Sequence, residues 1–122
     1  AGADFHGVHD WNIEFEFDRR DLPYAVDSLE SVQQLAWRSS PMAWTDTWTS
    51  PVLFVHGDDD RTVPFRESVR LAERLRARGV PFEEFVVPGD VHDFLVHENW
   101  VEAYRRTADF FRRQLAPPPR ER

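Results

Sequence analysis

The stretch of sequence that decides the fold is PVLFVHGDDDRTVPF, Pro51 to Phe65. Its first part, Val52 to Val55, is a continuous apolar run that stops at a His-Gly pair and three carboxylates. An apolar run without alternation predicts a strand buried on both faces, as in a parallel sheet. Pro64, after the acids, suits the first turn of a helix. The stretch therefore predicts a strand, an acidic loop and a helix start, and we expect chemistry in the loop from Gly57 to Val63, beyond the strand's carboxyl end.

The rest of the second half continues this alternation. Pro64 to Arg78 carries apolar residues three and four positions apart and stops at a glycine, which predicts a helix. Pro81 to Val87 predicts the next strand, Gly89 to His97 a loop, and Glu98 to Leu115 an amphipathic last helix. Strand, helix, strand and helix in succession indicate a doubly wound α/β fold with a parallel sheet.

The first half of the chain is less regular. Ala3 to Val8 predicts a strand end that runs into a loop. Asn12 to Asp18 alternates apolar and acidic residues, so periodicity favours a strand, and a short irregular helical lid is the rival interpretation. Leu22 to Trp37 predicts a helix, and Met42 to Ser50 predicts a loop. The expected α/β fold therefore has about three parallel strands with flanking helices.

The length of 122 residues allows one domain at most, and 41% hydrophobic content supports a core. We assign residues 1–116 to this domain and residues 117–122, which begin with prolines, to a disordered tail. The sequence opens with alanine in what reads as the middle of a strand, so we expect a fragment of a longer protein. Three strands leave an unpaired edge, through which we expect self-association.

The composition argues against several classes of function. A formal charge of −7 and a pI near 5.1 argue against nucleic-acid binding, which needs a basic patch. No apolar run approaches the ~20 residues of a membrane span. The absence of cysteine excludes a thiolate metal site and a cysteine nucleophile, and it fits the cytoplasm without fixing the redox compartment.

Two chemically useful side chains, Asp60 and His92, each follow a strand. Parallel strands present their carboxyl ends at one edge of a sheet, so we expect these side chains to lie together. A buried carboxylate that holds imidazole Nδ1–H leaves Nε2 free as a general base for a nucleophile. In α/β-hydrolases the chain order is Ser, Asp, His, with the serine in a Gly-x-Ser-x-Gly turn. The Asp and His have that order here, but no serine that we considered follows a glycine by two residues: Ser28, Ser31, Ser39, Ser40, Ser50 and Ser68.

A hard-cation site is the alternative interpretation of Asp58, Asp59 and Asp60 with His92, since carboxylate oxygens suit Mg²⁺ or Ca²⁺. Consecutive residues of an extended chain cannot all face one ion, and no spacing of ligands resembles an EF-hand. We therefore expect neither a metal ion nor another cofactor.

Several separate motifs resemble one enzyme family in their order and spacing. They are VLFVHGDDDRTVPF, ARGVPFEEFVVPGDVHDFL, WVEAYRRTADFFRRQL and the opening GADFHGVHDW, which cover nearly all of Ala1 to Leu115. They look like the C-terminal end of the catalytic domain of prolyl oligopeptidase-family serine peptidases, in particular bacterial dipeptidyl- and acylaminoacyl-peptidase-like members. The resemblance implies the C-terminal portion of an α/β-hydrolase fold and hydrolysis of peptide substrates.

The resemblance also implies roles for individual residues. Asp60 matches the triad aspartate of the family, and His92 matches the triad histidine. Trp11 and Val63 lie in stretches that help to line the substrate pocket in relatives. The nucleophilic serine would lie before Ala1, so we expect the isolated chain to be inactive.

Two other hypotheses stay open. The chain could be a non-catalytic module that pairs its exposed sheet edge with another chain, or an esterase with the same placement of Asp and His. Outside the expected pair, His56 is expected to support the acidic loop, and the other histidines are interpreted as structural or surface residues: His6, His9 and His97.

Overall fold

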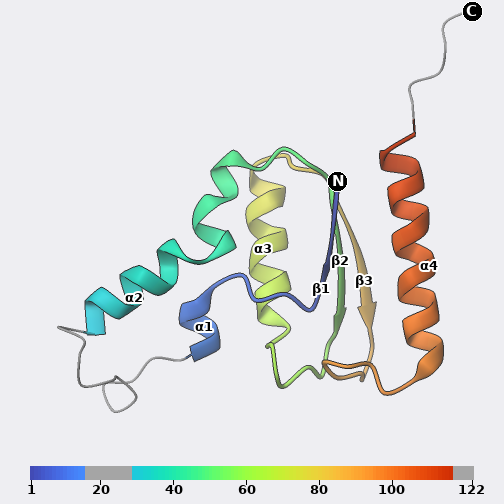
Figure 1. The fold of residues 1–122 in the computed structure, drawn as a ribbon, viewed down its shortest axis with the longest axis horizontal. Coiled ribbons are helices and arrows are strands. Elements are labelled where there is room, and N and C mark those ends of the chain that lie inside the picture. Colours follow the sequence, from blue (N-terminus) through green and yellow to red (C-terminus); the bar gives the residue numbers. More distant parts are fainter. Residues whose placement is uncertain (16–28, 117–122) are drawn as a thin grey trace, which may run out of the picture.

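The central apolar run forms strand β2, Val52–Gly57, and every residue of this strand is buried. The computed structural model describes residues 1–15 and 29–116, and it places β2 between β1, Gly2–Phe5, and β3, Phe82–Val87. Both pairings are parallel. The three strand arrows point the same way in Figure 1, so the loops that follow the strands meet at one edge of the sheet. The prediction of a parallel α/β arrangement is confirmed.

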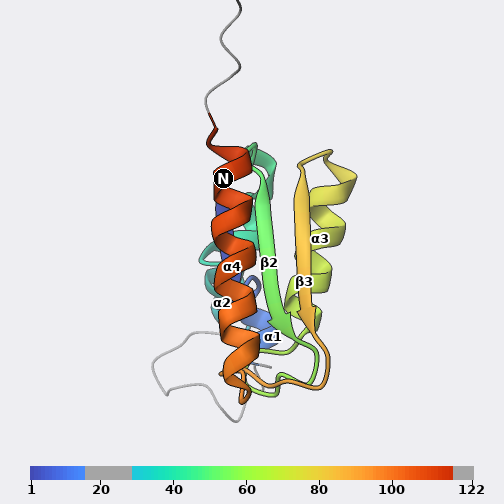
Figure 2. The same cartoon turned by 90° about the vertical axis from the view of Figure 1, so that its right-hand side faces the viewer.

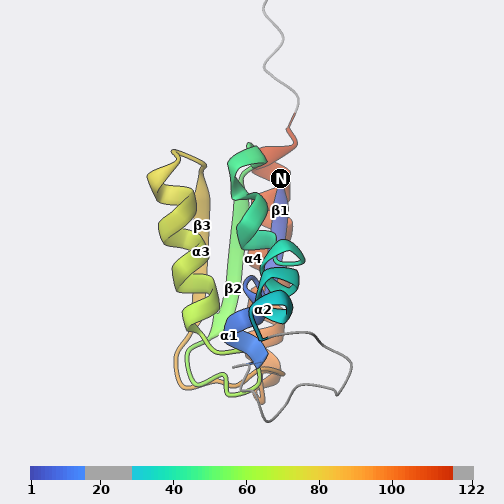
Figure 3. The ribbon, with the colours of Figure 1, turned by 90° about the vertical axis from the view of Figure 1, so that its left-hand side faces the viewer.

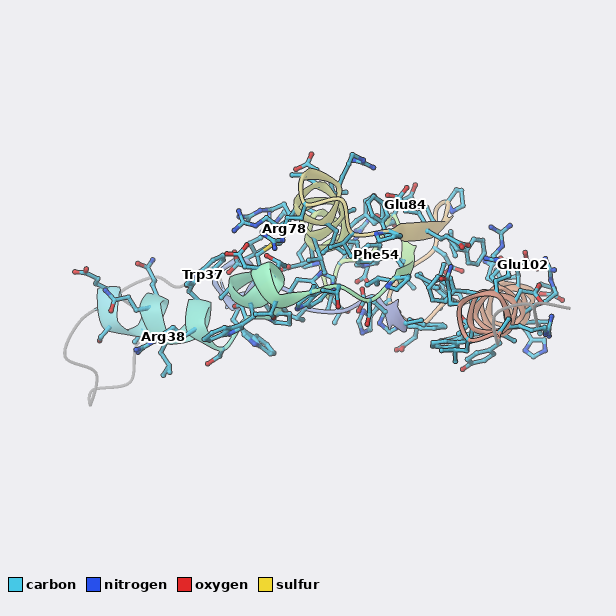
Figure 4. All side chains as sticks on the ribbon, turned by 90° about the horizontal axis from the view of Figure 1, so that it is seen from above. Trp37, Arg38, Phe54, Arg78, Glu84 and Glu102 are labelled. Atoms are coloured by element: carbon cyan, nitrogen blue, oxygen red, sulfur yellow. The ribbon has the colours of Figure 1, made fainter. Side chains whose placement is uncertain are left out.

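Two helices cover the opposite faces of this sheet, α3 (Arg66–Ala77) and α4 (His97–Gln114), as Figures 1 and 4 show. Figure 2 looks onto α4, with β2 and β3 behind it. Alternate residues of β2 serve the two faces, which is why the run needs no polar residue. The α3 side buries Met42, Val52, Phe54, Leu71, Ala72, Leu75 and Val80, and the α4 side buries Leu53, Val55, Val87, Phe94, Ala103 and Phe110.

Within the residues that the structure describes, three short helical elements extend from the β1 side, away from α4 (Figures 1 and 3). They are α1 (Trp11–Phe15), α2 (Leu29–Arg38) and the 3₁₀ helix η2 (Pro41–Thr47). For residues 12–15 the helical interpretation is correct and the strand interpretation is wrong. The loop predicted for Met42 to Ser50 is wrong for residues 42–47, because Pro41 starts a 3₁₀ helix there, and residues 48–50 lie outside any helix or strand.

Strand β1 ends at Phe5 and runs into a loop, within the segment Ala3 to Val8 for which a strand end and a loop were expected. His6 takes a left-handed backbone conformation with φ of 38°, which turns the chain out of the sheet directly after Phe5. The backbone N–H of His6 still donates to the carbonyl of Val55, at 2.8 Å, so the turn stays attached to β2. This early turn brings His6 to the same sheet edge as the loops after β2 and β3.

Some predictions concern residues that the structure does not describe. The predicted tail, residues 117–122, lies outside the described part, as do residues 16–18 of the alternating stretch and residues 22–28 of the predicted helix. Within the described residues, the outer edges of β1 and β3 have no strand partner. None of the described helices has the length and apolar character needed to cross a bilayer.

Candidate active site

The loops that follow β2 and β3 are hydrogen-bonded to each other along their length. The N–H of Asp58 donates to the carbonyl of Val87 at 3.3 Å, and the N–H of Asp59 donates to the carbonyl of Asp90 at 3.1 Å. The N–H of Gly89 donates to Asp58 Oδ1 at 2.6 Å. These bonds fix the acidic loop against the loop that carries the candidate base.

Gly57 makes the close approach of these loops possible. A Cβ at this position would overlap the backbone carbonyl of Asp90. Backbone cannot move aside as a flexible side chain can, so the glycine is required for space and not for an unusual φ. The His-Gly pair at the end of the apolar run therefore permits the two loops to touch.

The structure brings the two predicted site residues together. His92 Nδ1 lies 2.8 Å from Asp60 Oδ2. The Asp60 side chain is 0% exposed and the His92 side chain 26% exposed. Because an ionised carboxylate only accepts hydrogen bonds, Nδ1 carries the hydrogen and Nε2 keeps its lone pair in the neutral ring. The pair has the geometry of an oriented general base.

Four N–H groups donate to the Asp60 carboxylate. Oδ1 accepts the backbone N–H groups of Thr62 and Val63 at 2.8 and 2.9 Å, and Oδ2 accepts His92 and His56. Burial opposes ionisation of Asp60, but the hydrogen bonds from His92, Val63 and Thr62 outweigh it and lower the pKa of this carboxyl. Asp60 is therefore held as an anion at neutral pH.

His56 is the second imidazole on this carboxylate, consistent with its expected support of the acidic loop. Its Nε2 lies 3.0 Å from both Asp60 Oδ2 and the carbonyl oxygen of Val63. Both partners are acceptors, so Nε2 carries the hydrogen and Nδ1 accepts the Ser68 hydroxyl at 2.7 Å. His56 is 1% exposed, and it thereby links α3 to the candidate acid.

His6 belongs to the site although its sequence position gave it no role there. Its ring centroid lies 4.0 Å from that of His92 and 6.3 Å from that of His56. Burial and these two imidazoles lower the pKa of His6, so it stays neutral beside His92. The signal that could have found it is its place directly after a strand, at the edge where the two predicted residues also lie.

The two predicted pocket residues lie in different surroundings. Val63 is buried and contacts the site through its backbone, which binds Asp60 and His56. Trp11 begins α1, where its N–H donates to Ser40 Oγ at 2.9 Å. A role in lining a substrate pocket remains a prediction for both residues.

The three consecutive acids do not converge on one point. Asp58 accepts the N–H of Gly89, Asp59 forms an exposed pair with Arg61, and Asp60 points into the site. Among residues 1–15 and 29–116, no group of three or more potential ligands is placed to hold a metal ion.

A parallel sheet covered by helices on both faces, with an acid and an imidazole on the loops after adjacent strands, matches the arrangement of an α/β-hydrolase fold. A solved puromycin-hydrolyzing peptidase of Mycobacterium tuberculosis shares this fold with a TM-score of 0.79 at 23% identity, over 98% of this chain and 19% of that one. The model of the prolyl oligopeptidase family matches residues 1–117. The chain belongs to the prolyl oligopeptidase family.

Two curated relatives agree with this assignment. The dipeptidyl-peptidase 5 of Porphyromonas endodontalis is 32% identical over 86 residues, which are 70% of this chain and 12% of that protein. The acylamino-acid-releasing enzyme of Mus musculus is 32% identical over 73 residues, which are 58% of this chain and 10% of that protein. The chain thus spans about a tenth of the length of these relatives.

Proposed function

We propose that this chain supplies the acid and the base of a serine peptidase, with Asp60 as the orienting carboxylate and His92 as the general base. The observation that carries the proposal is the 2.8 Å hydrogen bond between His92 Nδ1 and Asp60 Oδ2, which leaves Nε2 available on a partly exposed ring. Membership of a peptidase family and the similarity to two named peptidases support the reaction class.

In the proposed reaction, a serine from a part of the protein that precedes Ala1 attacks the peptide carbonyl carbon through its Oγ. His92 Nε2 accepts the hydroxyl proton as the Oγ–C bond forms, and it returns the proton to the leaving amine nitrogen as the C–N bond breaks. Water then releases the acyl group by the same proton transfers. Asp60 stays ionised throughout and stabilises the imidazolium.

This proposal implies that the chain by itself does not hydrolyse peptides. Members of a triad act as a unit, so an acid and a base without the nucleophile lack the covalent route. A non-catalytic module is the alternative at this point. The module hypothesis predicts a natural protein without a reactive serine, held in a defined oligomer through its sheet edge.

An esterase with the same acid and base is the second alternative. Ester and amide hydrolysis use the same proton transfers and differ in the leaving group. The full-length protein is therefore offered an acylated amino acid amide and the matching ester. A peptidase turns over both substrates, whereas an esterase turns over only the ester.

The decisive variant is Asp60→Asn in the full-length protein, assayed on the amide. We expect kcat to fall by roughly 10⁴-fold, because the wrong imidazole tautomer then faces the nucleophile. Asp59→Asn is the matched control, since the Asp59 side chain is half-exposed and its carboxylate pairs with Arg61 at the surface. An Asp60→Asn variant with the activity of the Asp59→Asn control would refute the proposal.

A further inference from the structure

The loop that carries His92 is folded around a buried carboxylate for which the proposed reaction has no use. Asp90 follows β3 and is 5% exposed. Its Oδ1 accepts the backbone N–H groups of Val91 and Leu95, each at 2.9 Å. Val91 precedes His92 and Leu95 lies beyond it, so one oxygen joins the loop on both sides of the histidine.

The second oxygen of Asp90 ties this loop to helix α4. Asp90 Oδ2 accepts the side-chain amide of Asn99, in the first turn of α4, at 2.7 Å. Burial opposes ionisation of Asp90, but the hydrogen bonds from Asn99, Leu95, Val91 and Val96 outweigh it and lower its pKa. Asp90 is therefore an anion whose oxygens face donors from two elements.

The backbone of Asp90 is fixed as firmly as its side chain. Its carbonyl accepts the N–H of Asp59, the residue before the candidate acid, and lies against Gly57. On the far side of His92, Phe94 is 2% exposed in the core and its N–H donates to the carbonyl of Val91. His92 thus lies between two anchored points, one of which is also bonded to the loop of Asp60.

We propose that Asp90 and Asn99 are positioning residues that set the distance between His92 Nδ1 and Asp60 Oδ2. The proposal rests on the proposed function in so far as that pair is catalytic. A purely structural role would be to cap α4, whose N-cap residue Val96 makes no side-chain cap bond. Capping would affect the stability of α4 without changing the Asp60–His92 hydrogen bond.

The hydrogen bond between Asp90 and Asn99 can be tested with variants that change its donor and its acceptor separately. Asn99→Asp places two carboxylates together and removes the donor. Asp90→Asn alone should be mild, because the Asn99 amide can rotate and present its oxygen to the new amide. The double variant Asp90→Asn with Asn99→Asp restores a donor and an acceptor in exchanged positions. His97→Asp is the matched control, which adds the same charge to the same helical turn at an exposed position.

The variants are made in the full-length protein and followed by two readouts. The first is the downfield proton NMR signal of the His92 Nδ1–H, identified by its loss in His92→Gln; it requires no activity. The second is kcat and KM on the amide. For Asn99→Asp we expect the Nδ1–H signal to shift or disappear. We also expect kcat to fall by about 10- to 100-fold with little change in KM, because displacing a reacting group by about 1 Å lowers the rate by up to about that factor. The exchanged pair and the His97→Asp control should retain both readouts.

Each outcome decides the proposal. It is overturned if Asn99→Asp keeps the wild-type signal and kcat while folded, even when its unfolding temperature falls, because the role is then only structural. It is also overturned if the exchanged pair folds but restores neither readout. If the signal responds as expected but no variant, including the wild type, cleaves the amide, the proposed function fails and the positioning role stands. Should Asn99→Asp not fold, Asn99→Leu removes the donor without adding charge and is read in the same way.

Discussion

The Asp60 carboxylate joins the candidate base, His92, to the acidic loop and to His56. Two imidazoles share its Oδ2 and two backbone N–H groups share its Oδ1. Charge-assisted hydrogen bonds of this kind hold both the position and the ionisation of the group. The residue thus stabilises the loop and orients His92 by the same contacts.

The lowered pKa of Asp60 predicts a pH dependence of stability. A carboxyl whose folded pKa lies below the unfolded value of about 3.9 stabilises the fold above that value, and the contribution is lost as pH falls through the folded pKa. The free energy of unfolding of the wild type should therefore fall more between neutral pH and about pH 3 than that of Asp60→Asn. Urea titrations at several pH values measure the free energy of unfolding of both proteins. If it falls equally with pH in the wild type and in Asp60→Asn, Asp60 is not ionised as assigned.

His56 should contribute to stability even though it faces no substrate. His56→Leu leaves the Ser68 hydroxyl without its buried acceptor and removes one donor from Asp60, at a cost of about 1–3 kcal/mol. His97→Leu, at an exposed position, should change the free energy of unfolding by less than about 0.5 kcal/mol. Chemical denaturation compares the two variants, and equal stabilities would show that the His56 bonds contribute nothing.

The pairing of Asp60 with His92 could be predicted from the sequence because both residues follow strong strand signals. For His6 the one sequence signal was its place directly after a strand, and that signal is weak because the strand is short and the position of His6 depends on a left-handed turn that periodicity does not reveal. Asp90 was missed for a similar reason. Two of its donors are backbone groups of its own loop and a third is the side chain of Asn99, and no spacing of residue types predicts these contacts.

At the scale of elements, the site depends on how closely the loops after β2 and β3 approach each other. Figure 1 shows these loops side by side beyond the strand ends, and three hydrogen bonds donated by backbone N–H groups join them. Strand β2 was predictable from its continuous apolar run. The 3₁₀ helix η2 was not, because its Trp- and Thr-rich residues carry no helical periodicity and its start depends on Pro41.

Gly57→Ala should separate these loops. The added Cβ meets the carbonyl of Asp90, so we expect a loss of about 1–3 kcal/mol in the free energy of unfolding, typical of overpacking. Gly2→Ala is the control, because no atom lies within 4 Å of its added Cβ. Denaturation measures both variants. A Gly57→Ala protein as stable as Gly2→Ala would show that the loops have room to move apart.

At the scale of the whole molecule, apolar surface gathers on the β1 side of α4. Trp100 stacks on Phe5 and on Tyr104, and Tyr104 is 60% exposed. The outer edge of β1 lies unpaired beside this cluster in the described residues. The opposite edge is better protected, because Glu83 and Glu84 of β3 are charged and exposed.

This asymmetry predicts where the 122-residue chain self-associates. Tyr104→Lys should shift the chain toward monomer in sedimentation experiments over a concentration series, because it adds charge to the apolar cluster. Val86→Lys, on β3 and 38% exposed, is the control and should leave the association unchanged. A chain that stays monomeric at every concentration, or responds only to Val86→Lys, would contradict the prediction.

The most direct test of the account is labelling of the full-length protein with a fluorophosphonate, which reacts only with an activated serine. We predict that one serine preceding Ala1 is labelled, and that His92→Gln slows labelling by about 10³-fold or more because the serine loses its base. His97→Gln should label at the wild-type rate, since His97 is exposed on α4. A labelling rate that is the same in His92→Gln and in the wild type, or a protein in which no serine reacts, would contradict the claim that Asp60 and His92 are the acid and base of a serine peptidase.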